Sequence, residues 1–256
     1  MITAGVDCGS KSVRVVILKE GKIAGKAAVL AGMDASIAAE QAYDEALSEA
    51  GLSRDAVQKV VATGTGRPEA HFKDDTVTEV GADARGAHFL YPDVRTVVDV
   101  GAEEGRAIKV TAEGKVADFA INEKCAAGAG AFTEAMARAL EVPLEQLGDL
   151  SLQSTEAIPI NAQCAVFAES EVVGLVHRKT SKPNMARAIH DAIADRITSM
   201  ARRVGIEEKI ALIGGVAKNV GFVKSLENDL GTKVLIPAEP DFVGALGAAL
   251  VATDLV

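Results

Sequence analysis

The sequence predicts an α/β protein built from two related lobes, and three observations lead to this fold class. Patterns typical of β-strands alternate with patterns typical of α-helices, which indicates sheets that helices cover on both faces. A block near the N-terminus, Val6-Asp-Cys-Gly9, reappears 92 positions later as Val98-Asp-Val-Gly101. The chain has 256 residues, 48% of them hydrophobic, and can bury a core in each of two modest domains. Two lobes with a cleft between them are therefore the expected architecture.

The repeat extends beyond its first four residues. An arginine follows each aspartate at the same distance, Arg14 after Asp7 and Arg106 after Asp99. An apolar stretch and then a Glu-Gly-Lys turn come next in both copies. Each copy therefore predicts a strand, a tight Asp-x-Gly turn, a second strand, a glycine turn and a third strand.

The elements after each hairpin follow from hydrophobic periodicity. The first lobe is expected to contain a helix at Ile37–Ala50 and a strand at Lys59–Ala62. The elements expected in the second lobe are a helix at Ala129–Leu140, a helix at Phe167–Arg178, a helix from Pro183 to about Val204, a strand at Lys209–Ile213, a helix at Phe222–Leu230 and a strand at Lys233–Ile236. A last helix is expected to begin at about Asp241.

These elements predict the domain boundaries. The first lobe is expected to span residues 1–94, and a C-terminal helix at about 241–256 is expected to pack back on it. The second lobe is expected to span residues 95–240 and to carry the two cysteines of most interest, Cys125 and Cys164.

Composition excludes several classes of function. A formal net charge of −9 leaves no basic stripe for nucleic acid, and with 4% aromatic residues and no tryptophan base stacking is not expected. Apolar runs such as Val15–Leu18 and Ala245–Val251 are shorter than the roughly 20 residues that span a bilayer. The N-terminus lacks the basic and apolar regions of a signal peptide. We therefore expect a soluble, cytoplasmic protein that binds neither membrane nor nucleic acid.

Three glycine turns carry the chemistry. Asp7-Cys-Gly9 and Asp99-Val-Gly101 each place a carboxylate and a glycine where a strand ends, and Gly214-Gly215 ends another strand. Glycine lets backbone N–H groups approach an anion closely. A carboxylate beside phosphates is suited to hold Mg²⁺ through water, or to orient an attacking water. The sequence contains neither a Rossmann Gly-x-Gly-x-x-Gly after a strand nor a phosphate loop ending in Gly-Lys-Ser/Thr.

With these turns the chain resembles the acetate-kinase, sugar-kinase, Hsp70 and actin superfamily, whose two lobes are ribonuclease H-like and enclose a nucleotide. The two phosphate motifs of this superfamily are matched in this chain by Gly5-Val-Asp-Cys-Gly-Ser10 and Val98-Asp-Val-Gly101. Its adenosine motif is matched by Ile213–Asn219. The resemblance implies that ATP and Mg²⁺ bind, with Asp7 and Asp99 holding Mg²⁺ through water. The residues expected to contact ATP are Gly9, Ser10, Lys11, Gly101, Ala102, Gly214, Gly215, Val216 and Asn219.

Two of the three cysteines precede helical patterns. Cys125 lies in Asn-Glu-Lys-Cys-Ala-Ala-Gly-Ala-Gly, and Cys164 lies in Cys-Ala-Val-Phe-Ala-Glu-Ser-Glu. A helix N-terminus stabilises a thiolate, which favours metal or cluster ligation. The alternative is a structural role, in which both cysteines are small buried residues at helix starts. Cys8, within the first phosphate motif, is interpreted as a small apolar core residue.

Both cysteine segments closely resemble the cluster-binding motifs of one branch of the superfamily. This branch contains the ATPase activators of 2-hydroxyacyl-CoA dehydratases and the ATP-binding subunits of benzoyl-CoA reductases, and the resemblance extends over essentially the whole chain. It implies a 4Fe–4S cluster shared between two subunits, with Cys125 and Cys164 as this chain's ligands. It also implies an identical or paralogous partner subunit, a ferredoxin or flavodoxin donor of low potential, and a reductase or dehydratase that receives the electron.

The second phosphate motif departs from the pattern of the homodimeric activators. Where they have Asp-Ile-Gly-Gly-Gln-Asp, this chain has Asp99-Val-Gly-Ala-Glu-Glu-Gly-Arg106. Ala102 replaces a glycine, and Glu103 places a charge near the expected γ-phosphate. The predicted catalytic residues are Asp7, Asp99 and Glu103. The departure favours an ATP-binding subunit of a benzoyl-CoA reductase.

Three other interpretations remain open at this point. The first is a homodimeric activator of a 2-hydroxyacyl-CoA dehydratase, which differs in its partner rather than in its chemistry. The second is a small-molecule kinase on the same fold, in which the cysteines are structural. The third is a nucleotide switch or filament protein without a catalysed reaction.

Overall fold

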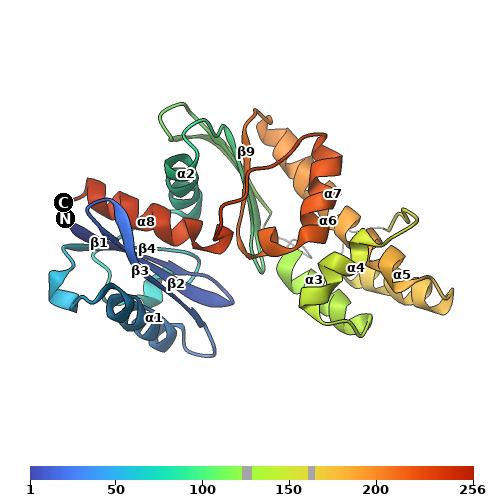
Figure 1. The fold of residues 1–256 in the computed structure, drawn as a ribbon, viewed down its shortest axis with the longest axis horizontal. Helices are drawn as coiled ribbons and strands as arrows, with labels where there is room; N and C mark the ends of the chain where they lie inside the picture. The colour runs from blue at the N-terminus through green and yellow to red at the C-terminus, as the bar shows by residue number, and fades with distance from the viewer. Residues whose placement is uncertain (123–128, 161–164) are drawn as a thin grey trace. The chain divides into compact units, whose positions relative to one another are not determined.

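The computed structural model describes residues 1–122, 129–160 and 165–256 (Figure 1). The chain divides into two compact units. Unit 1 contains Met1–Val94, Val110–Ala117 and Asp241–Val256, and unit 2 contains Arg95–Lys109 and Asp118–Pro240. Within the described ranges, no helix has both the length and the apolar character needed to cross a membrane.

Unit 1 is built on a five-stranded sheet in the order β3-β2-β1-β4-β5. Its strands are β1 (Ile2–Cys8), β2 (Ser12–Lys19), β3 (Lys22–Leu30), β4 (Lys59–Thr63) and β5 (Asp75–Thr76). The first three strands form antiparallel hairpins, whereas β4 runs parallel to β1. A parallel neighbour requires a crossover connection, and helix α1 (Ala35–Ala50) supplies it.

Helices cover both faces of this sheet because its central strands are apolar on both sides. Val13, Val15 and Ile17 pack with α1 on one face. Val16 and Leu18, which point the opposite way along β2, pack with helix α8 (Val243–Asp254). Helix α2 (Glu79–Leu90) packs against α8 (Figure 1). The expected sheet with both faces covered is confirmed for unit 1.

The ends of α1 explain why the helix begins two residues before its apolar pattern. The Asp34 side chain caps its N-terminus by accepting hydrogen bonds from the backbone N–H groups of Ser36 (3.0 Å) and Ile37 (3.2 Å). Gly51 ends the helix at φ 65°, a left-handed conformation that favours glycine.

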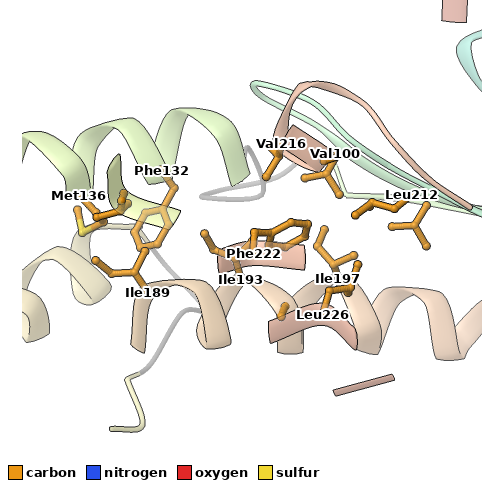
Figure 2. Packing of buried hydrophobic residues seen from close by; sticks show 14 of the residues in the cluster. Val100, Phe132, Met136, Ile189, Ile193, Ile197, Leu212, Val216, Phe222 and Leu226 are labelled. Carbon is orange, nitrogen blue, oxygen red and sulfur yellow. The ribbon is translucent and has the colours of Figure 1, made fainter. Parts of the chain in front are cut away.

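Unit 2 holds most of a four-stranded sheet in the order β8-β7-β6-β9. The strands are β6 (Thr96–Val100), β7 (Gly105–Val110), β8 (Val116–Asn122) and β9 (Ile210–Ile213). Its helices are α3 (Ala129–Ala139), α4 (Leu144–Leu152), α5 (Ala165–His177), α6 (Lys182–Val204) and α7 (Val220–Leu230). Figure 2 shows their shared core, in which Phe222 of α7 lies among Ile193 and Ile197 of α6 and Leu212 of β9.

The repeat predicted from the two Asp-x-Gly blocks is confirmed in both sheets. Strands β1, β2 and β3 correspond to β6, β7 and β8, and the parallel partners β4 and β9 complete the correspondence. The hairpin register matches as well. Asp7 lies opposite Arg14 in one hairpin, and Asp99 lies opposite Arg106 in the other.

The structure differs from the expected elements in three respects, of which the first is the short strand β5, which was not expected. The strand expected at Lys233–Ile236 is a single bridge between Leu235 and Ala211, because Pro237 has no N–H to continue the ladder and the N–H of Val234 bonds the Glu227 carboxylate. Helices α2 and α4 were not expected: α2 is rich in glycine and alanine, and α4 is short.

Candidate functional site

The first predicted phosphate motif forms a tight turn at the end of β1. The N–H of Gly9 donates to the carbonyl of Ser12 (3.2 Å), which closes the turn between β1 and β2. Ser10 and Lys11 lie exposed at its tip. The structure therefore brings Asp7, Gly9, Ser10 and Lys11 together on one turn of unit 1, where the exposed groups are able to meet an anion.

Asp7 lies against two glycines from distant parts of unit 1. A Cβ on Gly64, which ends β4 at φ 89°, would overlap the carbonyl of Cys8 and lie 2.8 Å from the Asp7 Oδ1. A Cβ on Gly244, at the start of α8, would lie 3.1 Å from the Asp7 Oδ2 and 3.3 Å from Oδ1 of the buried Asp83. The first lobe thus gathers two carboxylates at one place. The sequence analysis assigned no role to Asp83, because its position next to Asp7 depends on how α2 packs on α8.

The second predicted phosphate motif has the same construction in unit 2. The N–H of Gly101 donates to the carbonyl of Glu104 (2.9 Å), and Ala102 and Glu103 form the tip, with Glu103 exposed. Gly214 ends β9 at φ 86°, and a Cβ there would overlap the Asp99 Oδ1 and lie 2.5 Å from the carbonyl oxygen of Val100. Gly214 therefore leaves room for Asp99 as Gly64 leaves room for Asp7.

Two charged residues, Glu104 and Arg106, bond to this motif, and the sequence analysis assigned neither of them a role. Arg106 donates from Nη1 to the Asp99 Oδ2 (2.5 Å) and from Nη2 to the Glu104 Oε2 (2.5 Å). The signal that could have found Arg106 is the hairpin itself, because the predicted turn places the residue directly opposite Asp99.

The predicted adenosine motif forms a short 3₁₀ turn, Gly215–Lys218, after β9. Gly215 is exposed, whereas Val216 is buried in the core of unit 2. Asn219 caps helix α7, since its Oδ1 accepts from the N–H groups of Gly221 (3.0 Å) and Phe222 (3.1 Å). Its amide nitrogen lies 3.1 Å from the His190 Nε2. Asn219 therefore positions the turn and the helix that follows it.

The cap also determines which ring nitrogen of His190 carries the proton. Because the Asn219 Oδ1 accepts two backbone N–H groups, its Nδ2 donates, so the His190 Nε2 accepts and the ring carries its proton on Nδ1. His190 is fully buried, and burial lowers its pKa from 6.5 to about 4. The ring is neutral in the folded protein at pH values where an unfolded chain protonates it.

This difference predicts a stability loss in acid. The contribution of His190 to the free energy of unfolding is fully present above the unfolded pKa of 6.5, and it is lost as the pH falls toward the folded pKa of about 4. Between pH 7 and pH 5 the free energy of unfolding should fall by about 2 kcal/mol because of His190. His190→Gln retains an acceptor for Asn219 and should remove that part of the loss. Urea unfolding at both pH values measures it.

The exposed His71 offers the matched control. His71→Gln should keep the stability loss of the wild type between pH 7 and pH 5. Equal losses in wild type and His190→Gln would show that His190 is not responsible.

The second phosphate motif is bonded directly to helix α3. The N–H of Gly130 donates to the carbonyl of Gly101 (3.2 Å), and the N–H of Ala131 donates to the carbonyl of Ala102 (2.9 Å). A Cβ on Gly130 would lie 2.8 Å from the Ala102 Cα and 3.0 Å from the Gly101 oxygen, so glycine is required for this approach. The first turn of α3 is thereby fixed to the motif expected to contact phosphate.

Cys125 and Cys164 lie outside the described residues, in 123–128 and 161–164. Cys125 precedes α3 in the sequence, and Cys164 directly precedes α5. Cys8 is buried in the core of unit 1, and burial, with a smaller contribution from Asp7, raises its pKa to about 12. Its interpretation as an apolar core residue is confirmed, because a protonated, buried thiol is a poor ligand.

Comparison with known proteins extends these observations to the whole chain. Residues 4–252 match the family described as the BadF/BadG/BcrA/BcrD ATPase family. The activator of lactoyl-CoA dehydratase from Anaerotignum propionicum is 39% identical over 254 residues, covering 99% of this chain and 98% of that protein. One of the subunits of benzoyl-CoA reductase from Thauera aromatica is 35% identical over 97% of this chain and 92% of its own length.

Solved structures agree with the sequence relatives. The activator of the 2-hydroxyisocaproyl-CoA dehydratase from Clostridium difficile, with bound ADPNP, matches with a TM-score of 0.93 at 34% identity, over 100% of this chain and 95% of that chain. A ROK family glucokinase from Streptomyces griseus matches over 99% of this chain and 100% of its own with a TM-score of 0.62 at 14% identity, which concerns the fold alone. The predicted α/β fold of the two-lobed ATPases is confirmed.

Proposed function

This chain belongs to the BadF/BadG/BcrA/BcrD ATPase family, and we propose that it is an ATP-dependent activator of a 2-hydroxyacyl-CoA dehydratase. The observation that carries the proposal is the 39% identity to a dehydratase activator over 99% of the chain. The fold of an activator with a bound ATP analogue covers all of the chain as well. The activity proposed is transfer of an electron to the dehydratase, driven by ATP.

The comparisons favour the alternative of the sequence analysis over its main interpretation. The Ala102 and Glu103 departure suggested a component of a benzoyl-CoA reductase, and one such component does match at 35% identity. The lactoyl-CoA dehydratase activator matches at higher identity, and a dehydratase activator of known structure matches with a TM-score of 0.93. A departure confined to one turn is weaker support than similarity along the whole chain.

Three turns are the proposed ATP contacts. We assign the phosphates to the backbone of Gly9, Ser10 and Lys11 in unit 1 and of Gly101 and Ala102 in unit 2. The adenosine is assigned to the turn of Gly214, Gly215, Val216 and Asn219. The phosphate assignments are supported by two tight turns at strand ends, which the N–H groups of Gly9 and Gly101 close and which leave Ser10, Lys11 and Glu103 exposed. The adenosine assignment is supported by the exposed Gly215 in the turn after β9.

Asp7 and Asp99 are the proposed holders of Mg²⁺, through water. Each aspartate is the last residue but one of its strand, beside a predicted phosphate turn, and carboxylate oxygens are ligands that Mg²⁺ takes in proteins. When bound, Mg²⁺ neutralises charge on the phosphates. Glu103, exposed at the tip of its turn, is the proposed group that accepts a proton from the attacking water.

A 4Fe–4S cluster shared between two subunits is the proposed electron carrier. Four thiolates usually hold such a cluster, so Cys125 and Cys164 of this chain and the same pair in an identical partner would complete it. A ferredoxin or flavodoxin of low potential is the proposed donor. The hydrogen bonds from Gly130 and Ala131, which fix the first turn of α3 to the second phosphate motif, support a coupling between the nucleotide and the cluster.

A small-molecule kinase is not proposed. The likeness to a glucokinase is at 14% identity and shows the shared fold alone.

Reconstitution tests the proposal and separates the two family activities. The reduced protein, MgATP and a 2-hydroxyacyl-CoA dehydratase should together dehydrate a 2-hydroxyacyl-CoA thioester, measured by chromatography of the CoA esters. Controls lack the reductant or contain MgADP instead of MgATP. Dehydration without ATP, or reduction of benzoyl-CoA with the catalytic subunits of a benzoyl-CoA reductase and no activity toward the dehydratase, would contradict it.

A further inference from the structure

A charged trio lies beside the second phosphate motif. Arg106 of β7 lies opposite Asp99 of β6 and pairs with both Asp99 and Glu104, each at 2.5 Å. The Arg106 and Asp99 side chains are only 11% and 10% exposed. Charge-assisted hydrogen bonds with so little competition from water are strong and restrict the geometry of both partners.

The two carboxylate oxygens of Asp99 have different surroundings. Its Oδ2 accepts from Arg106, and its Oδ1 lies over Gly214, where a Cβ would overlap it. Glu104 completes the arrangement, because its carbonyl accepts from the N–H of Gly101 (2.9 Å) while its carboxylate accepts from Arg106. Glu104 therefore closes the turn with its backbone and holds the Arg106 guanidinium with its side chain.

The first lobe uses the equivalent arginine differently. Arg14 lies opposite Asp7, in the same register, but its Nε donates to the Asp241 Oδ2 (3.1 Å) at the start of the last helix. The repeat thus has the same backbone and a different ion pair in each copy. In the second lobe the arginine of the hairpin bonds the aspartate opposite it, and in the first lobe Arg14 bonds Asp241.

We propose that Arg106 is a positioning residue for ATP hydrolysis, which holds the Asp99 carboxylate in its working orientation, and that Glu104 holds Arg106. The inference rests on the proposed function, in which Asp99 acts at the phosphates. The guanidinium also offsets one negative charge next to a polyanionic ligand. Because Arg106 acts through Asp99, its removal should slow the reaction without weakening nucleotide binding to the same extent.

The test is a double-mutant cycle on ATP hydrolysis by the complete protein. Arg106→Gln should lower kcat about 10- to 100-fold, as expected when a reacting group is misplaced by about 1 Å, and should change KM for ATP less than about 3-fold. Arg106→Lys should recover a measurable part of kcat, because it restores one charged donor. In the Asp99→Asn background, Arg106→Gln should cause no further loss.

Two further variants keep the test decisive. Glu104→Gln leaves Arg106 in place and should lower kcat by about 3- to 10-fold, even if Arg106→Gln folds poorly. Arg187→Gln breaks a pair with Asp191 on helix α6 of unit 2 (3.2 Å) and should leave kcat unchanged. Equilibrium binding of ADPNP, measured by calorimetry, should be retained in every Arg106 and Glu104 variant.

The outcomes separate this inference from the proposed function. A wild-type protein without ATPase activity overturns both. An active wild type in which Arg106→Gln keeps its kcat, or in which the losses from Arg106→Gln and Asp99→Asn multiply, overturns the inference alone. A parallel loss of kcat, ADPNP binding and thermal stability without rescue by lysine would assign Arg106 a purely structural role.

Discussion

Changing either Cys125 or Cys164 to serine is expected to abolish iron binding. Anaerobically purified wild-type protein should hold about four irons per two chains. A serine hydroxyl is a hard and poorly acidic group, so it does not replace a thiolate on soft iron–sulfur centres. Each single variant removes two of the four proposed ligands in a symmetric dimer. Iron analysis and the visible absorption spectrum measure the loss.

Cys8 supplies the matched control for both variants. Its thiol is buried in the core of unit 1, and its pKa is raised to about 12. Cys8→Ala should therefore retain the full iron content. A wild-type protein that activates a dehydratase without iron, or a Cys125→Ser or Cys164→Ser variant with normal iron, would contradict the assigned ligands.

Gly130→Ala is expected to uncouple nucleotide turnover from dehydratase activation. The new Cβ would lie 2.8 Å from the Ala102 Cα, so the loop and helix α3 must separate. The hydrogen bonds from Gly130 and Ala131 to Gly101 and Ala102 would then be lost or lengthened. Coupling energies of this kind are about 0.5 to 2 kcal/mol, so activation per ATP hydrolysed should fall about 10-fold. Iron content should stay normal.

Gly174→Ala is the control for helix substitutions in the same unit. Gly174 lies within α5, and among the described residues no heavy atom comes within 4 Å of a Cβ placed there. Alanine at this position should preserve the coupling ratio and stabilise the helix by up to about 1 kcal/mol. If both glycine variants activate the dehydratase as wild type does, the contact between loop and helix does not transmit the nucleotide state.

Local pattern was enough to predict the backbone of both sheets except the two-residue strand β5. The Asp-x-Gly turns, the equal spacing to Arg14 and Arg106 and the alternating apolar strands each depend on residues close in sequence. Such signals survive without tertiary information, because turn chemistry and strand period act over a few residues. The predicted core role of Cys8 followed in the same way.

The contacts that position the candidate site depend on tertiary packing. The fit of Gly214 against Asp99 joins residues that are distant in the sequence but adjacent across β6 and β9. The bonds between Gly130 and the Gly101 turn likewise depend on where α3 packs. Glycine was predicted to matter at position 214 because of its backbone, and the neighbour that requires it was not predictable from spacing.

Subtype was the least predictable property. One turn, from Gly101 to Gly105, differs from the activator pattern, and it suggested a benzoyl-CoA reductase component. Similarity over 99% of the chain favours a dehydratase activator instead. The difference lies in a single turn, whereas the identity to the relatives is counted over almost every position of the chain.

The central claim is that the nucleotide state and the cluster are coupled, and a redox titration of the cluster tests it most directly. The midpoint potential and the EPR spectrum of the reduced dimer are measured without nucleotide, with MgADP and with MgADPNP. Coupling predicts that the midpoint potential differs among the three nucleotide states. The expected difference is about 59 mV for each tenfold difference in nucleotide affinity between the oxidised and reduced protein. Three coincident potentials with identical spectra, together with equal ADPNP affinity in both oxidation states, would contradict the account.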